Sequence, residues 1–313
     1  MIKYYKDANE LRIHDYEAVS FFKNQYHQSR YLEVLSFERL KERLTGLVLD
    51  LIEISRNGNP ILDIKNGKSA IAFVEVLEEF KIRNKDINKN IANIFKKFPY
   101  SIRSKDLSNI IEKIEELRGK KCLFKFTPKK YVSDILEGKV RFCSASSYNR
   151  QGYNIAIKDD EMNIESNIKN LLMTDEEGNP IPSTDDKITA HSTADYHVSC
   201  FSVNFCFKLF ALFESDSCVV ITDGDKFCDA VKREFLKHKP KCCFWANQVG
   251  YIDTCKQFKS ELPLQMSKSS NYSYQEEYRF AGFPKYKHVN IEPELIIEVD
   301  PSNFNYQVLK IHN

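Results

Sequence analysis

The sequence predicts an α+β protein in which a helical module, residues 1–118, precedes a domain built on antiparallel strands, residues 119–313. Apolar residues of the first part recur at three- and four-residue steps, which is the period of an amphipathic helix. The second part holds short runs of β-branched and aromatic residues separated by turn residues. Because most of these runs are short, we predict an antiparallel-rich domain and not a doubly wound parallel sheet.

The apolar pattern of the first module predicts four helices, at residues 37–52, 69–80, 87–98 and 104–118. The first ends before the turn sequence Asn57-Gly58-Asn59-Pro60. The last has Ser104 as a candidate N-cap and Gly119 as a candidate C-cap. The module contains no catalytic constellation, so we expect it to support the second domain or to bind a partner.

The second domain begins with a predicted strand at 121–126, a helix with Thr127 as its N-cap that ends at Gly138, and a strand at 140–145. The same patterns predict further strands at 196–203, 218–222, 243–245, 248–252, 272–280 and 294–299, and helices at 205–213 and 224–238.

An acidic segment near residues 153–194 interrupts this series. Between Lys158 and Lys187, three lysines stand against nine Asp and Glu residues. One helix is predicted there, from Ile164 to Met173. We interpret the segment as an insertion or a mobile lid.

The formal net charge of +2 is too small to indicate a nucleic-acid ligand, but its distribution is uneven. Residues 81–105 carry eight Lys and Arg residues against Asp86 alone, and they include Phe95, Phe98 and Tyr100. Such a stretch could follow a phosphate backbone. A solvated helix face is the alternative interpretation.

The nine cysteines are odd in number and show no paired metal-ligand spacing, so we predict reduced thiols in a cytoplasmic protein and no metal site. The first ten residues contain no apolar run typical of a signal peptide. No apolar stretch approaches the length of a membrane span, and we therefore expect no membrane partner.

Residues 272–280 alternate aromatic and polar side chains, which is the pattern of a half-buried strand. In that register Gln275, Glu277 and Arg279 share one face and Glu276 lies on the other. An amide, a carboxylate and a guanidinium would therefore be presented together. An exposed strand face that carries an ordinary Glu and Arg is the alternative.

Three motifs follow one another in the second domain: Leu123-Phe124-Lys125-Phe126-Thr127, then Ser199-Cys200-Phe201-Ser202, then Gln275-Glu276-Glu277. In this order they resemble the motif series of the toxin-like ADP-ribosyltransferases. The resemblance covers roughly residues 120–313. It implies a split antiparallel β-sheet with peripheral helices. Lys125 stands where the better-known branches have Arg or His, and Cys200-Phe201 replaces the usual Thr between the serines.

The same part of the chain is also similar to a bacterial domain family of uncharacterised function. The counterparts of that family's motifs are Phe124-Lys125-Phe126, Tyr148-Asn149, Ser199 to Ser202, and Gln275-x-Glu277-x-Arg279.

The resemblance implies NAD as a substrate, with Glu277 and Gln275 as catalytic residues. Cleavage of the bond between nicotinamide and ribose develops positive charge on the ribose, which Glu277 would stabilise, while Gln275 would orient the acceptor. The implied cofactor-binding residues are Lys125, Phe126, Ser199, Ser202, Tyr148, Asn149 and Arg279.

The expected function is that of a mono-ADP-ribosyltransferase toxin that modifies nucleic acid, with RNA (mRNA) favoured over protein, in defence against phage. A toxin of this kind implies an antitoxin protein as a partner. Two alternatives remain open: an NAD glycohydrolase, which transfers the ribose to water, and a non-enzymatic protein that binds RNA or acts as a defence scaffold.

Overall fold

The structure is a computed structural model that describes residues 16–63, 67–96, 102–149, 159–169, 173–174, 177, 179–181, 187–256, 262–286 and 289–311. The first fifteen residues, part of the basic stretch (97–101) and much of the acidic segment lie outside the described residues.

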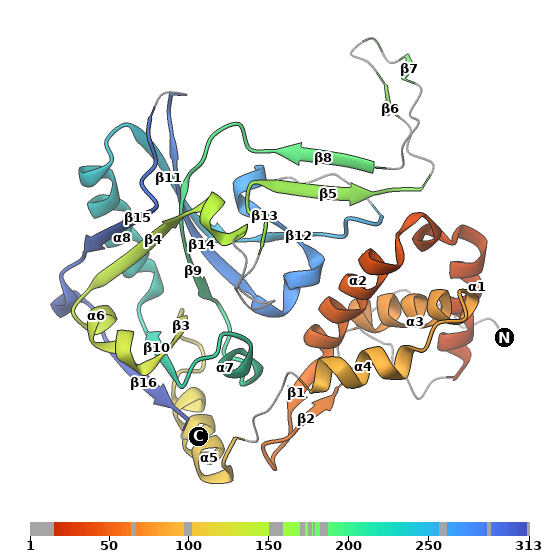
Figure 1. Ribbon diagram of the computed structural model, residues 1–313. Coiled ribbons are helices and arrows are strands. Elements are labelled where there is room, and N and C mark those ends of the chain that lie inside the picture. The colour runs from red at the N-terminus through yellow and green to blue at the C-terminus, as the bar shows by residue number, and fades with distance from the viewer. Residues whose placement is uncertain are drawn as a thin grey trace.

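The N-terminal part is helical, as predicted. Its helices are α1 (Tyr16–Ser29), η2 (Tyr31–Val34), α2 (Phe37–Leu51), α3 (Gly67–Ile82), α4 (Ile87–Phe95) and α5 (Ser104–Glu116). The first of these helices lie to one side of the sheet, whereas the last, α5, lies below the sheet near the C-terminus (Figure 1). Helix α2 is shorter than predicted because the next residues form a hairpin of β1 (Ile52–Ile54) with β2 (Pro60–Leu62). Arg103 and not Ser104 occupies the N-cap of α5, whereas Gly119 adopts the positive φ expected of a C-terminal glycine.

The central sheet has eight strands, all paired antiparallel, as the short runs predict. They are β3 (Leu123–Thr127), β4 (Lys139–Ser144), β9 (His197–Ser202), β10 (Ser217–Ile221), β11 (Cys242–Gln248), β14 (Glu277–Pro284), β15 (Glu294–Glu298) and β16 (Tyr306–Lys310). The main path runs β11-β14-β9-β3-β10-β16, and β4 joins β15 to β9. The patterns predicted strands that overlap each of these except β16, although the one predicted at 272–280 overlaps only the first half of β14.

Strand β9 is the point at which the sheet branches. One edge of β9 pairs along its whole length with β14. Its other edge pairs with β4 at one end, through His197 and Val198, and with β3 at the other end, through Ser202 alone. Because β3 and β4 diverge from each other along this edge, side chains between them can face a cavity.

Two apolar cores hold the elements in place. One lies on the α8 side of the sheet (α8, Gly224–His238) and includes Phe235 and Phe280. The other is continuous from the helical part to the sheet, since Leu44 and Phe80 belong to the same cluster as Phe124. The helices are therefore packed against the sheet by buried apolar surface, which is the main stabilising term in folding.

Two predicted elements are wrong. Residues 272–280 are not one strand: the 3₁₀ helix η6 (Ser270–Gln275) is followed by Glu276 in the left-handed region, with φ 42°, and β14 begins only at Glu277. The helix predicted from Ile164 to Met173 is also absent in the described part of that segment, where β5 (Asn163–Asn167) pairs with β8 (Lys187–His191). Burial alternates from one residue of β5 to the next, which is the pattern of a strand and not of a helix.

Smaller elements complete the described chain: η3 (Lys129–Tyr131), α6 (Val132–Leu136), η4 (Ala145–Asn149), β6 (Met173–Thr174), β7 (Pro180–Ile181), α7 (Lys208–Leu212), β12 (Gly250–Ile252), η5 (Leu264–Met266), β13 (Ser267–Ser269) and η7 (Pro301–Asn303). Thr127 ends β3 and does not cap the following helix, whose first turn is 3₁₀. In the described part of the chain no helix is long and apolar enough to cross a membrane.

Candidate active site

A cavity of about 220 Å³ opens beside β9, between β3 and the start of β14. We call it the inner cavity. The predicted site residues that line it are Lys125, Phe126, Tyr148, Ser202, Gln275 and Glu277. Residues from all three sequence motifs thus meet at one place, although they are far apart along the chain.

Glu277 is a buried carboxylate of this cavity, with 2% of its surface exposed. Its two oxygens contact two cations: Arg279 Nε at 2.6 Å and Lys268 Nζ at 3.0 Å. Its backbone N–H donates to the hydroxyl of Tyr251 at 2.9 Å. Burial alone would raise the pKa of Glu277, but the positive charges of Arg279 and Lys268 hold that pKa well below its ordinary value. Glu277 is therefore ionised at neutral pH.

Arg279 lies two residues further along the same face of β14 and is fully buried. Besides Glu277, it contacts Glu161 Oε2 through Nη1 at 2.7 Å, and the same nitrogen donates to the carbonyl of Gln265 at 2.9 Å. Its Nη2 has no hydrogen-bond partner among the described residues. Arg279 does not line the inner cavity; it fixes the position of Glu277 from behind.

Lys268 of β13 joins the polar groups of the site, and the sequence patterns did not indicate it. Its ammonium contacts Glu277, Glu161 at 3.3 Å and Asp159 at 3.1 Å, and it donates to the side-chain carbonyl of Gln275 at 3.1 Å. Burial lowers the pKa of Lys268, but the three carboxylates raise it well above its ordinary value, so the side chain stays charged.

Glu161 is the second residue that sequence reasoning missed. It is buried, it comes from the acidic segment just before β5, and its backbone carbonyl accepts from the hydroxyl of Tyr196 at 2.9 Å. Burial raises the pKa of Glu161, and the nearby cations Arg279 and Lys268 offset this only in part. In sequence, Glu161 is one of several neighbouring acidic residues, and such runs are usually solvated.

Gln275 and Glu276 point to opposite sides, as the pattern predicted, but a turn and not strand alternation separates them. Gln275 is buried, and its side-chain nitrogen lies 3.5 Å from the hydroxyl of Tyr274. Glu276 is exposed, and its carboxylate accepts a hydrogen bond from the side chain of Asn204. The left-handed backbone at Glu276 brings Gln275 back toward Glu277.

The structure separates the two serines of the second motif. Ser202 pairs with Glu277 across β9 and β14 and lines the inner cavity. Ser199 lies on the other face of β9, and its buried hydroxyl has no partner among the described residues. Cys200 takes the cavity-facing position beside Ser202. Burial, with the Glu277 charge added, raises the pKa of the Cys200 thiol well above its ordinary value, so it stays protonated.

Lys125 and Phe126 form part of the opposite wall. The ammonium of Lys125 donates to the carbonyl of Cys200 at 2.6 Å and lies 4.9 Å from the ring centre of Phe201. Burial lowers the pKa of Lys125. The Phe126 ring packs edge-on against Phe210, 5.1 Å between ring centres, and so connects this wall to the apolar core.

Tyr148 and Asn149 are neighbours in sequence but line different spaces. Tyr148 lines the inner cavity, and burial raises its pKa well above the ordinary value, so its hydroxyl stays protonated. Asn149 lines a second cavity and donates to Asp160 at 3.2 Å.

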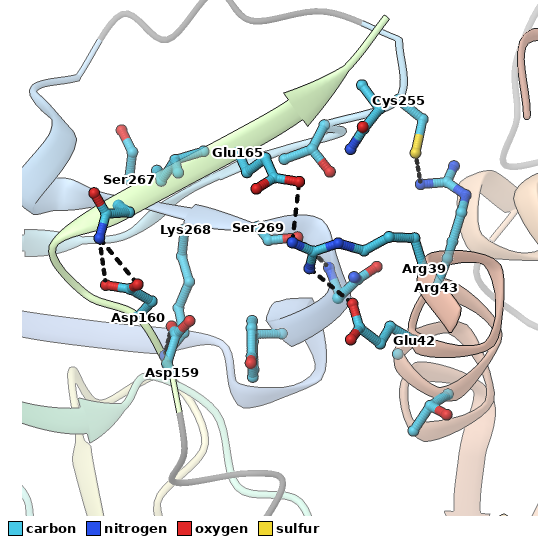
Figure 2. Close-up of a pocket in the computed structure, with 18 of the residues that line it drawn as sticks. Arg39, Glu42, Arg43, Asp159, Asp160, Glu165, Cys255, Ser267, Lys268 and Ser269 are labelled. Atoms are coloured by element: carbon cyan, nitrogen blue, oxygen red, sulfur yellow. Dashed lines mark hydrogen bonds and ion pairs between the residues drawn. The ribbon is translucent and has the colours of Figure 1, made fainter. Parts of the chain in front are cut away.

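The second cavity, which we call the outer cavity, has a volume of about 540 Å³. Figure 2 shows it between α2, which carries Arg39 and Arg43, and the strand that carries Glu165. Arg39 bridges Glu42 at 2.8 Å and Glu165 at 3.0 Å. Glu161 and Lys268 line both cavities, so the two spaces lie on either side of this ion pair.

Among the residues that the structure describes, no group of His, Cys, Asp and Glu side chains has the arrangement of a metal site. All nine cysteines are free thiols. Comparison of the chain with protein-family models, with curated proteins and with solved structures finds no match.

Proposed function

We propose that the protein is an NAD-dependent mono-ADP-ribosyltransferase and that Glu277 is its principal catalytic residue. The observation that carries the proposal is the meeting of Lys125, Ser202 and the Gln275-Glu276-Glu277 motif at one cavity, with a buried, ionised carboxylate at its centre. A split antiparallel sheet also agrees with the resemblance of the motifs.

The environment of Glu277 suits the chemistry. Departure of nicotinamide leaves positive charge on the ribose, and a fixed, buried carboxylate stabilises that charge as it forms. Arg279 and Lys268 keep Glu277 ionised and hold it in one orientation. Gln275, held by Lys268, lies beside it and would orient the acceptor.

The inner cavity fits one end of the dinucleotide. Pockets that enclose a whole ligand usually measure about 300–1,000 Å³. At about 220 Å³, the inner cavity has room for the nicotinamide riboside end, with Phe126 and Tyr148 as aromatic walls. The ammonium of Lys125 faces the same space and would meet a ribose hydroxyl or a phosphate. Ser199, which faces away, would act only through the packing of β9.

The biological setting that we propose is that of a toxin acting on RNA in the cytoplasm, in defence against phage, with an antitoxin partner. The basic stretch near residues 81–105 supports an RNA acceptor over a protein acceptor. An enzyme that modifies RNA of its own cell requires an inhibitor, which supports the antitoxin.

Incubation of the protein with labelled NAD and total cell extract tests the proposal. Label that is released by nuclease digestion and not by protease identifies RNA as the acceptor. Label in protein would support a transferase but would exclude RNA as its acceptor. Free ADP-ribose without labelled macromolecule would indicate a glycohydrolase, and intact NAD would contradict the proposal.

A further inference from the structure

We propose that the outer cavity binds the acceptor as an unpaired nucleobase, and that Glu161 is a second catalytic residue that accepts the acceptor's proton. This inference rests on the transferase proposed above. Its geometric basis is that Glu161 and Lys268 are shared by both cavities. A group bound in the outer cavity would therefore meet the donor across Glu161.

The charges of the outer cavity favour a base over a phosphate. Its lining includes five carboxylates, those of Glu42, Asp159, Asp160, Glu161 and Glu165, but only three cations, those of Arg39, Arg43 and Lys268. The cations are already paired: Arg43 holds Asp253 through two contacts of 2.8 and 2.9 Å. Surplus positive charge, which phosphate binding requires, is absent from this lining.

The polar groups that remain available are of the kind that read base edges. The side-chain amides of Asn167 and Asn271 line the outer cavity and make no hydrogen bond to the described residues. Carboxamides pair with base edges through two hydrogen bonds, and unstacked bases pack against aromatic rings. Tyr272 supplies such a ring in the same lining, whereas Tyr274 beside it is buried in the apolar core.

The pKa values of the two carboxylates beside the cavities are shifted in opposite directions. Burial raises the pKa of Glu161, whereas Arg279 and Lys268 outweigh burial at Glu277 and lower its pKa. Two neighbouring acids with diverging pKa values are a sign of different chemical roles. Glu277 therefore stays charged, whereas Glu161 binds a proton more readily than an ordinary glutamate.

The titratable and charged groups around Glu161 are Arg279 and Glu277 of β14, Lys268 of β13, Tyr196 and Cys200 of β9, Tyr148 of η4, Tyr272 of η6 and Asp159 of its own segment.

The step balances with NAD as the only co-reactant. Glu161 takes the proton of an acceptor N–H as that nitrogen bonds to the ribose C1′ carbon. The nicotinamide departs as a neutral molecule with the electron pair of the broken glycosidic bond.

The binding part of the inference is tested without NAD. A labelled single-stranded oligoribonucleotide of mixed sequence is titrated into the wild-type protein and into the Asn167→Ala, Asn271→Ala and Asn303→Ala variants. Asn303 is exposed on η7 and serves as the control. We expect each cavity variant to weaken binding about tenfold, with no change in its salt dependence, because a base contact and not a phosphate contact is lost. Equal binding by the cavity variants and the control would overturn the inference.

The catalytic part is tested by the pH profile of transfer. In the wild type the rate should rise as Glu161 loses its proton, and the Glu161→Gln variant should lose this step and be slower by about a hundredfold. Glu79→Gln, at a buried carboxylate that lines neither cavity, controls for loss of buried charge and should keep the step. If the Glu161→Gln variant still shows the rise of rate with pH, the proposed role of Glu161 is overturned. Absence of NAD cleavage by the wild type would instead contradict the transferase itself.

Discussion

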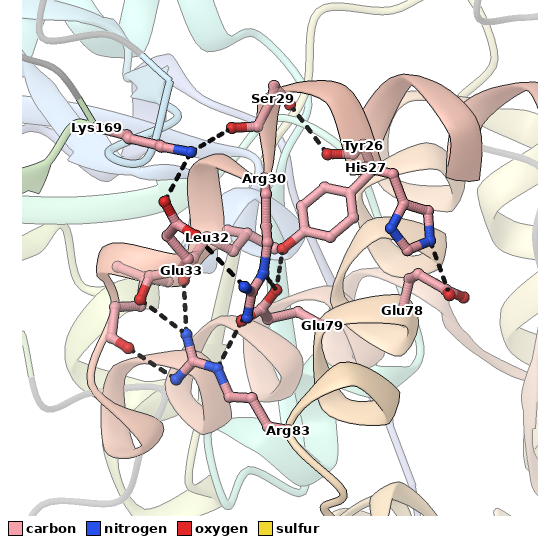
Figure 3. Close-up of polar contacts among 11 residues, drawn as sticks. Tyr26, His27, Ser29, Arg30, Leu32, Glu33, Glu78, Glu79, Arg83 and Lys169 are labelled. Carbon is pink, nitrogen blue, oxygen red and sulfur yellow. Dashed lines mark hydrogen bonds and ion pairs between the residues drawn. The ribbon is translucent and has the colours of Figure 1, made fainter.

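Glu79 and Glu277 are buried carboxylates that are each held by two basic side chains, but in two different settings. Glu79 of α3 is fully buried and contacts Arg30 Nε and Nη2, both at 3.2 Å, Arg83 Nε at 2.6 Å, and the hydroxyl of Tyr26 (Figure 3). Glu277 of β14 has the equivalent pair in Arg279 and Lys268. Burial opposes ionisation at both sites, yet the neighbouring charges lower both pKa values.

The difference lies in what surrounds each cluster. In the helical part, Arg83 also donates to the backbone carbonyls of Leu32 and Leu35, and Glu79 lines neither cavity, so its cluster joins α1, η2 and α3. Glu277, in contrast, lines the inner cavity. Burial and pairing of a charge therefore do not distinguish a structural cluster from the proposed catalytic one, whereas open space beside the charge does.

The largest expected effect is on turnover. Glu277→Gln should lower the rate of NAD cleavage by about a hundredfold or more, because a charge that acts in the transition state is removed. Glu276→Gln is the matched control, since Glu276 is exposed and faces away, and it should change the rate by less than about twofold. Equal losses of rate in the two variants would contradict the catalytic role of Glu277.

The helical cluster should respond in stability and not in chemistry. Glu79→Ala leaves Arg30 and Arg83, which are partly exposed, without their carboxylate, and should lower the free energy of unfolding by about 1–3 kcal/mol. Urea unfolding measures this change. The folded variant should keep the wild-type KM for NAD, and a selective loss of NAD affinity would show that the helical cluster belongs to the site.

Gly46 of α2 tests how closely the two regions are joined. A Cβ placed there would lie 2.6 Å from the backbone of Asn271 in η6, the element that carries Gln275. Ser273 of η6 also donates to Asp50 of α2 at 3.3 Å. Gly46→Ala should therefore lower stability by about 1–3 kcal/mol and slow turnover as η6 shifts. Thermal unfolding and NAD cleavage, measured together, would show whether both fall; unchanged turnover would mean that α2 does not position the site.

The smallest expected effect is the response to acid. Glu79 and Glu277 have pKa values below the ordinary 4.5 in the folded state, so both bind protons more weakly when folded than when unfolded. Their stabilisation is complete above about pH 4.5 and is lost as the pH falls through the folded-state values. Glu79→Gln should flatten this loss in acid unfolding curves. An unchanged unfolding curve would mean that groups other than Glu79 cause the loss of stability in acid.

The fold class was predictable because local patterns dominate it: helical periodicity in the first part and short apolar runs in the second both hold in the structure. Local patterns failed where backbone conformation was set by tertiary contacts. The alternation around Tyr274 suggested one strand, but packing of η6 against α2 and the left-handed turn at Glu276 override it.

The candidate site was partly predictable. Motif order indicated Lys125, Ser202, Gln275 and Glu277, and the structure brings them to one cavity. Strand alternation places Cys200 on the same face as Ser202 and Ser199 on the opposite face. The motif resemblance instead grouped Ser199 with Ser202. Glu161 and Lys268 could not be found, because a buried ion pair between distant segments has no local signature.

The most direct test of the account measures release of nicotinamide from labelled NAD by the wild type and by Glu277→Gln, with thermal unfolding to confirm that both are folded. We predict release by the wild type and a rate lower by about a hundredfold or more in the variant. Equal release by two folded proteins, or none by the wild type in the presence of cell extract, would contradict the assignment of Glu277 as the catalytic carboxylate.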